Sequence, residues 1–153
     1  MAKSRYAYTT KHQREELDEM VVVMLEFFNS RYLINIYYET PPENPNHIAE
    51  INYNPYSEEA YLYIRRDFYE KPRIERLQII AHEITHVVNY RVHDTVMKII
   101  EQLPEGPAKN LALELYKREN EFFIEELAKA IIAYSDNLFA KIDKKINEKK
   151  NKQ

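Results

Sequence analysis

The sequence contains no cysteine and no tryptophan, and it has one glycine among 153 residues. Without cysteine the chain forms no disulfide, thiolate metal site or cysteine nucleophile, so any metal ion must bind to His, Asp or Glu. One glycine excludes the glycine-rich phosphate loops of nucleotide-binding proteins. No apolar run reaches the length of a signal peptide or a membrane-spanning helix. These absences predict a cytoplasmic protein without a membrane anchor.

The charges are nearly balanced, with 22 basic and 25 acidic side chains. Because such a balance produces no strong field of one sign, we expect no nucleic-acid partner. The length and the 44% hydrophobic content fit one domain over residues 1–153. Its lysine- and asparagine-rich end, residues 144–153, is expected to be a frayed polar tail.

The first half of the chain changes from a helical to a strand pattern. Apolar residues recur every three or four positions from Lys11 to Arg31, which predicts an amphipathic helix. Short β-branched and aromatic segments follow, and they predict strands at residues 33–38, 47–53 and 60–65. The short turns favour antiparallel neighbours. We therefore expect a small, mostly antiparallel three-stranded sheet.

The second half has the pattern of helices. An apolar stripe predicts a helix from Pro72 to about Arg91, and Asp94 can cap a short helix that ends at Leu103. After a break at residues 104–107, a long helical pattern runs from 108 to about 145, and residues 135–137 can divide it. The expected fold class is α+β, with an N-terminal helix, the sheet, an active-site helix and a long C-terminal helix.

The predicted active-site helix contains the motif His82-Glu83-Ile84-Thr85-His86. Residues four apart lie on one face of a helix, so the imidazoles of His82 and His86 can bind a single ion. Glu83 is one step round the helix, beside the metal, where its carboxylate can take a proton from water. This pattern is typical of zinc metallohydrolases.

A catalytic zinc ion needs a third protein ligand in addition to the two histidines. His93 shares their helix face, but two further turns place it about 10 Å away, too far to bind the same ion. The long helix offers Glu121 and Glu125 at one-turn spacing, so one can bind metal while the other orients a histidine. Glu119 and Glu126 are alternative ligands on the same helix.

These two segments resemble gluzincin metallopeptidases, in which a helix downstream of the histidine motif supplies a glutamate ligand. The resemblance covers residues 74–133 and includes the order of elements in the minimal soluble members. It implies one Zn²⁺ ion with His82, His86 and Glu121 as ligands, Glu83 as general base, and Glu125 as the acid that hydrogen-bonds a ligating histidine. Two departures are Glu125, where the family commonly has Asp, and the bulky Ile124 before it.

The expected function is hydrolysis of peptide bonds in a peptide or protein substrate by a metal-activated water. By the same resemblance, the strand at residues 60–65 can be the sheet edge that pairs with an extended peptide, and an ordinary sheet strand is equally compatible with the sequence. Candidates for oxyanion stabilisation are His93, Tyr90, Tyr61 and Tyr63. One alternative is a noncatalytic zinc module that acts in protein–protein interaction or regulation, and another is a helical interaction protein without metal.

Overall fold

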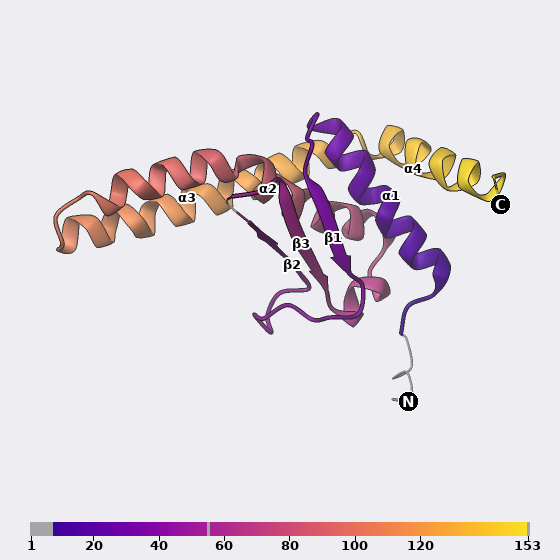
Figure 1. Cartoon of the computed structure of the whole chain (residues 1–153), viewed down its shortest axis with the longest axis horizontal. Helices are drawn as coiled ribbons and strands as arrows, with labels where there is room; N and C mark the ends of the chain where they lie inside the picture. The colour runs from indigo at the N-terminus through magenta and orange to yellow at the C-terminus, as the bar shows by residue number, and fades with distance from the viewer. Residues whose placement is uncertain (1–7, 55, 153) are drawn as a thin grey trace.

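The structure, a computed structural model, describes residues 8–54 and 56–152. Its elements are α1 (Lys11–Phe27), β1 (Leu33–Tyr37), β2 (Ala49–Tyr53), β3 (Glu59–Ile64), the 3-10 helix η1 (Arg66–Glu70), α2 (Arg73–Glu101), α3 (Pro107–Ile132) and α4 (Ser135–Lys150). Figure 1 shows α2 and α3 side by side as a long hairpin that projects beyond the sheet, with α1 and α4 at the opposite end of the molecule. The predicted α+β class is confirmed.

The ends of α1 show how a chain with so little glycine makes its turns. Thr10 caps the helix: its hydroxyl accepts a hydrogen bond from the Gln13 backbone N–H, and the Gln13 side chain accepts one from the Thr10 N–H. After the helix ends, Asn29 takes a left-handed conformation with φ of 50°. Asparagine tolerates this conformation better than most residues, so it serves where glycine is common.

The sheet has the strand order β1-β3-β2. β3 is antiparallel to β2, as the short turn between them predicts, but it is parallel to β1. Of the two interpretations of residues 60–65, the sheet edge is wrong and the ordinary strand is confirmed, because β3 lies between its two neighbours. The connection from β1 to β2 is long and contains three prolines, so these consecutive strands do not form a hairpin, and β2 becomes an edge strand.

The hydrophobic core lies between one face of the sheet and the helices α1 and α2. Alternate residues of β3, including Leu62 and Ile64, are fully buried there, as a period of two requires. Fully buried side chains from the helices meet them, among them Leu17, Leu77 and Ile80. Each such side chain contributes about 1.5–3 kcal/mol through its removal from water. The core therefore fixes the position of α2 against the sheet.

Helix α2 is one continuous helix of 29 residues, so the prediction of a helix end near Arg91 and a new helix at Asp94 is wrong. No glycine or proline occurs between Arg73 and Leu103, and the Asp94 carboxylate accepts a hydrogen bond at 2.6 Å from Lys98, one turn later, instead of capping a helix start. The single glycine, Gly106, has a φ of 149° in the turn before Pro107, where α3 begins.

The predicted long C-terminal helix is divided, since α3 ends at Ile132 and α4 begins at Ser135. The prediction of a frayed tail from Lys144 is wrong as far as Lys150, because α4 is helical to that residue. Ile146 is buried against the core, and Lys149 forms an ion pair with the buried Glu19 of α1. Gln153 lies outside the described residues. In residues 8–54 and 56–152, no helix has the length and apolar character needed to cross a membrane.

Candidate metal centre

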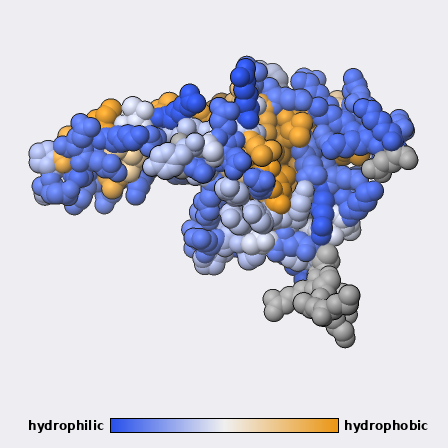
Figure 2. Space-filling model, viewed as in Figure 1, coloured by the Kyte–Doolittle hydropathy of each residue, from blue (hydrophilic) through white to orange (hydrophobic). Residues whose placement is uncertain are grey.

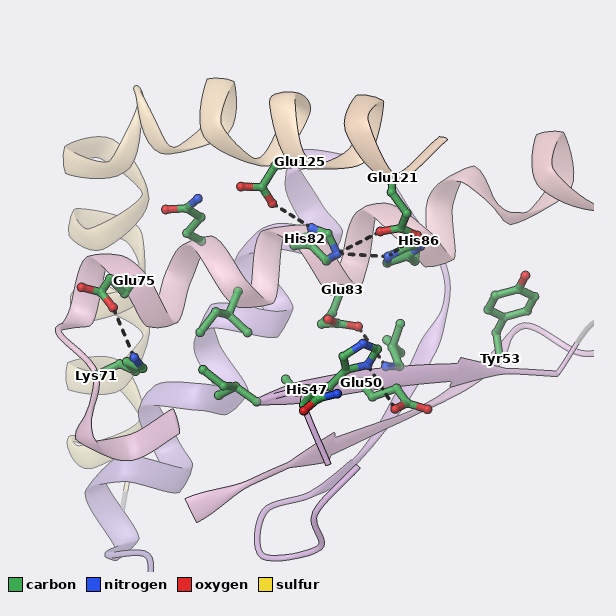
Figure 3. Close-up of a pocket in the computed structure, with 16 residues that line it drawn as sticks. His47, Glu50, Tyr53, Lys71, Glu75, His82, Glu83, His86, Glu121 and Glu125 are labelled. Atoms are coloured by element: carbon green, nitrogen blue, oxygen red, sulfur yellow. Dashed lines mark hydrogen bonds and ion pairs between the residues drawn. The ribbon is translucent and has the colours of Figure 1, made fainter. Parts of the chain in front are cut away.

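Three side chains from two helices converge on one face of α2. His82 and His86 lie one turn apart on α2, and Glu121 reaches them from the neighbouring α3 (Figure 3). One ligand atom from each residue lies within 4.8 Å of the other two. Among the described residues, these three form the one group of at least three His, Asp or Glu side chains with such spacing. The structure thus brings together the three residues that the sequence predicts as metal ligands.

The distances between the donor atoms fit a zinc ion. His82 Nε2 and His86 Nε2 are 3.1 Å apart. One Glu121 oxygen, Oε2, lies 3.8 Å from the first nitrogen, and the other, Oε1, lies 3.6 Å from the second. Donors that each lie about 2.1 Å from a tetrahedral ion are about 3.4 Å from one another. Two imidazole nitrogens and one carboxylate are also a common donor set for catalytic zinc. The residues present therefore fit the ion that the motif implies.

Glu125 faces the other nitrogen of the first histidine. Its Oε2 atom lies 3.3 Å from His82 Nδ1, so this imidazole has Glu121 on one side and Glu125 on the other. The contact has the distance of an ion pair but not the direction of a hydrogen bond, and His82 Nδ1 is buried without a hydrogen-bond partner. Such a carboxylate fixes the imidazole tautomer that leaves Nε2 free to bind metal.

Glu83 points from α2 toward the sheet, where the backbone of β2 holds it. The Ile51 N–H donates a hydrogen bond of 2.9 Å to Glu83 Oε2. Two hydrogen bonds flank the pairing of β2 with β3: the Arg65 N–H donates to the Ile48 carbonyl, and the Asn54 N–H donates to the Glu59 carbonyl. In an antiparallel pair such bonding residues alternate, so the backbone groups of Ile51 point away from β3 to the open edge. One carboxylate oxygen of Glu83 is therefore anchored by the edge strand.

Burial changes the acidity of both the carboxylate and the second histidine. Removal from water raises the pKa of Glu83 to about 8, although the Ile51 hydrogen bond opposes this shift, and the negative charges of Glu121 and Glu50 add to it. Burial also lowers the pKa of His86 to about 4, with His82 contributing repulsion. His86 is thus held in the neutral form that binds metal, and Glu83 holds a proton more tightly than an exposed carboxyl does.

The converging side chains open into a cavity of about 940 Å³. One wall is α2 with Glu121 and Glu125 of α3, and the other is β2 with the loop before it (Figure 3). Three residues of this second wall, His47, Glu50 and Tyr53, are absent from the sequence prediction. No motif marks them, because their place in the cavity depends on which of the two edge strands, β1 or β2, lies beside α2. Once β2 is known as the edge, its position beside α2 identifies them.

Other predicted residues lie away from the cavity. Glu119 pairs with Arg118, and Glu126 with Lys129, all on exposed helix surface. Neither carboxylate joins the group formed by His82, His86 and Glu121. Among the four acids considered on α3, Glu121 is the one whose oxygens reach both histidines.

The candidates for oxyanion stabilisation are also displaced from the main cavity. Tyr61 and Tyr63 alternate with the buried residues of β3, so they lie on the opposite face of the sheet, where Tyr37 stacks on Tyr63. Tyr90 packs against aromatic rings from the sheet side. His93 stacks on Tyr116 and lines a second cavity of about 220 Å³, which shares Tyr53, His86 and Glu121 with the main cavity. The structure instead lines the main cavity with Tyr53 and His47.

Comparison of the chain with protein-family models, curated proteins and solved structures found no match. The chemistry of the site is therefore argued from the positions of its own residues.

Proposed function

We propose that this protein is a zinc-dependent peptidase. The observation that carries the proposal is the geometry of His82, His86 and Glu121, whose donor atoms converge beside a carboxylate, Glu83, that is anchored to the edge of the sheet. The three converging residues would hold the ion. A zinc ion bound there supplies Lewis acidity, which polarises a carbonyl group and makes water more acidic.

Glu83 carries the proton in the proposed reaction. Its Oε2 atom is held by the Ile51 N–H, so its other oxygen can face the cavity and accept a proton from water. Because burial raises its pKa to about 8, the protonated carboxyl is stable enough to deliver the same proton to the leaving amine. Glu125 positions His82 through Nδ1. The chain thus provides a base, an acid and an oriented ligand from two helices and one strand.

The open edge of β2 provides a binding surface for an extended peptide. Ala49 and Tyr53 are two residues before and after Ile51, so their backbone groups point to the same edge. A substrate strand can add to that edge through main-chain hydrogen bonds, which bring its carbonyl carbon into the cavity beside Glu83. This geometry supports a peptide substrate. The strand to which the peptide would add is β2 rather than the strand at residues 60–65.

The alternative of a noncatalytic zinc module requires a site closed by a fourth protein ligand. Within the described residues, the converging group has three members and faces a cavity of about 940 Å³. A purely structural site also has no need for a buried carboxylate anchored beside it. These features favour the catalytic proposal.

A zinc and hydrolysis measurement on the purified protein tests the proposal. We expect one zinc ion per chain and cleavage within a mixed peptide library followed by mass spectrometry. The Glu83→Gln variant should retain the ion and lose at least about a thousandfold in rate, because the amide cannot accept the proton. Stoichiometric zinc without any cleavage by the unaltered chain would reject the peptidase and favour the noncatalytic module.

A further inference from the structure

The cavity contains more carboxylates than the proposed reaction uses. Five of them line it: Glu50, Glu75, Glu83, Glu121 and Glu125. The proposed ligand and the proposed base account for two, and the carboxylate that faces His82 accounts for a third. The remaining two lie at different places along the cavity wall, and their charges are balanced to different extents.

A lysine balances the charge of Glu75. Lys71 Nζ lies 4.0 Å from Glu75 Oε2, and both residues lie at the end of the cavity near the start of α2 (Figure 3). Glu125 likewise has a cationic neighbour, with Lys129 Nζ at 3.5 Å. Opposite charges at these distances cancel much of each other's field. Neither carboxylate therefore presents a full negative charge to a molecule in the cavity.

Glu50 has no such cation beside it. Its Oε2 atom lies 3.4 Å from His47 Nδ1, a histidine that is charged only when protonated, and accepts a long hydrogen bond of 3.5 Å from the Asn44 N–H. In the described ranges 8–54 and 56–152, no lysine or arginine forms an ion pair with Glu50. Its side chain is 21% exposed, so it is partly withdrawn from water. A partly buried carboxylate in this setting gains from a cation supplied by a ligand.

The position of Glu50 puts it close to the reacting groups. It precedes Ile51, the residue whose N–H holds Glu83, so its side chain leaves β2 on the sheet face of its partner Tyr63. It lines the cavity at the edge of the strand, with His47, on the wall opposite His82 and His86 (Figure 3). An extended peptide on the edge of β2 would run past this carboxylate within a residue or two of the bond to be cleaved. The charge of Glu50 would therefore act on a side chain or a terminus adjacent to that bond.

We propose that Glu50 is a specificity-determining residue that selects peptides with an amino or guanidinium group next to the scissile bond. The proposal rests on the peptidase function proposed above. The cation is a lysine or arginine side chain or a free α-ammonium group, and both would form the same charge-assisted contact with the carboxylate. His47 and Asn44 contact the carboxylate, but neither supplies the fixed positive charge of a lysine or an arginine.

Matched peptides test this selection. A cleavable sequence is made with lysine or with its uncharged analogue norleucine on either side of the scissile bond, each with a free or an acetylated N-terminus. We expect the unaltered protein to favour the charged peptide by about tenfold or more in kcat/KM. If acetylation removes the preference, the recognised cation is the α-ammonium group. If acetylated peptides with lysine are still preferred, it is the lysine side chain.

Two variants test whether the charge preference depends on the Glu50 carboxylate. Glu50→Gln should reduce the ratio of kcat/KM for the charged and the uncharged peptide to about one and leave the zinc content unchanged. The ratio within one variant is the readout, because loss of the Glu50 charge also acts on Glu83 and alters the rate with both peptides. Glu43→Gln, an exposed acid in the preceding loop that does not line the cavity, should keep the preference. Equal kcat/KM for charged and uncharged peptides in the unaltered protein, or an undiminished preference in Glu50→Gln, would overturn the proposal.

A binding measurement separates this inference from the proposed reaction. The same peptides carry a fluorophore and are titrated by anisotropy into the Glu83→Gln protein, with and without Glu50→Gln. Binding that depends on charge and on Glu50 would support the selection even if no peptide is cleaved, in which case the hydrolysis proposal alone fails. Cleavage without any charge dependence in rate or binding would reject the selection and retain the peptidase.

Discussion

The two halves of the α2–α3 hairpin differ in whether the sheet and the core pack against them. The proximal half, residues 73–91 and 119–132, packs against the sheet and the core, whereas the distal half, residues 92–118, projects beyond them (Figure 1). In α3 every buried residue belongs to the proximal half, and in α2 one buried residue, Ile100, belongs to the distal half. Figure 2 shows apolar side chains on the surface of the projecting part, where Val92, Ile99 and Leu111 are more than half exposed.

The proximal half has two histidines that face α3, His82 and His86, and the distal half has one, His93. The sheet lies behind the proximal half alone. In the proximal half, removal from water shifts the pKa of Glu83 upward and that of His86 downward, and two α3 carboxylates face His82. In the distal half, His93 meets the Tyr116 hydroxyl at 3.2 Å. Two helices are enough to pair polar side chains. Burial also raises the pKa of Tyr116 in the distal half, but the shifts large enough to change the acidity of Glu83 and His86 occur where the sheet adds a third layer.

The largest expected difference between the halves concerns zinc. Replacement of His82, His86 or Glu121 by alanine should abolish stoichiometric zinc, because two protein ligands hold the ion too weakly to survive dialysis. His93→Ala is the matched change in the distal half and should retain one ion per chain. Mass spectrometric metal analysis, with circular dichroism as a folding control, measures both. Full zinc in Glu121→Ala would remove this residue from the proposed ligand set.

A second contrast compares isoleucines on the same helix. Ile80 is fully buried against the core, and Ile99 is 59% exposed. Ile80→Ala should lower the free energy of unfolding by about 2–5 kcal/mol, since it leaves a cavity, whereas Ile99→Ala should change it by less than about 0.5 kcal/mol. Urea denaturation gives both values. Equal losses would mean that the distal surface is covered in solution, for which sedimentation would show association.

The smallest expected effect concerns Glu125. Because its carboxylate faces His82 Nδ1, Glu125→Ala should weaken zinc binding about 10- to 100-fold without removing a ligand. Glu126→Ala, one residue further along and paired with Lys129 on the surface, is the control and should leave the affinity unchanged. Competition with a chromogenic chelator gives the two dissociation constants. A similar affinity in both variants would assign Glu125 to the solvated surface.

Much of the local structure could be predicted because it depends on neighbours in the sequence. The apolar periodicity predicts the helices, and α1 and the break between α3 and α4 are confirmed. The missed continuity of α2 has a local cause: Asp94 is compatible with a helix start, but no residue nearby ends a helix, and the side chain binds Lys98 instead. The frayed end from Lys144 was mispredicted because buried Ile146 packs against residues far away in the sequence.

For this protein, the sequence alone determined that His82 and His86 share a helix face and that Glu83 lies beside them, because one helical turn fixes those positions. The tertiary structure decided which α3 carboxylate meets the histidines, since that depends on the axial register of two packed helices. It also decided that β2 forms the sheet edge at the cavity. That result depends on β3 entering between β1 and β2, a long-range pairing that local patterns do not encode.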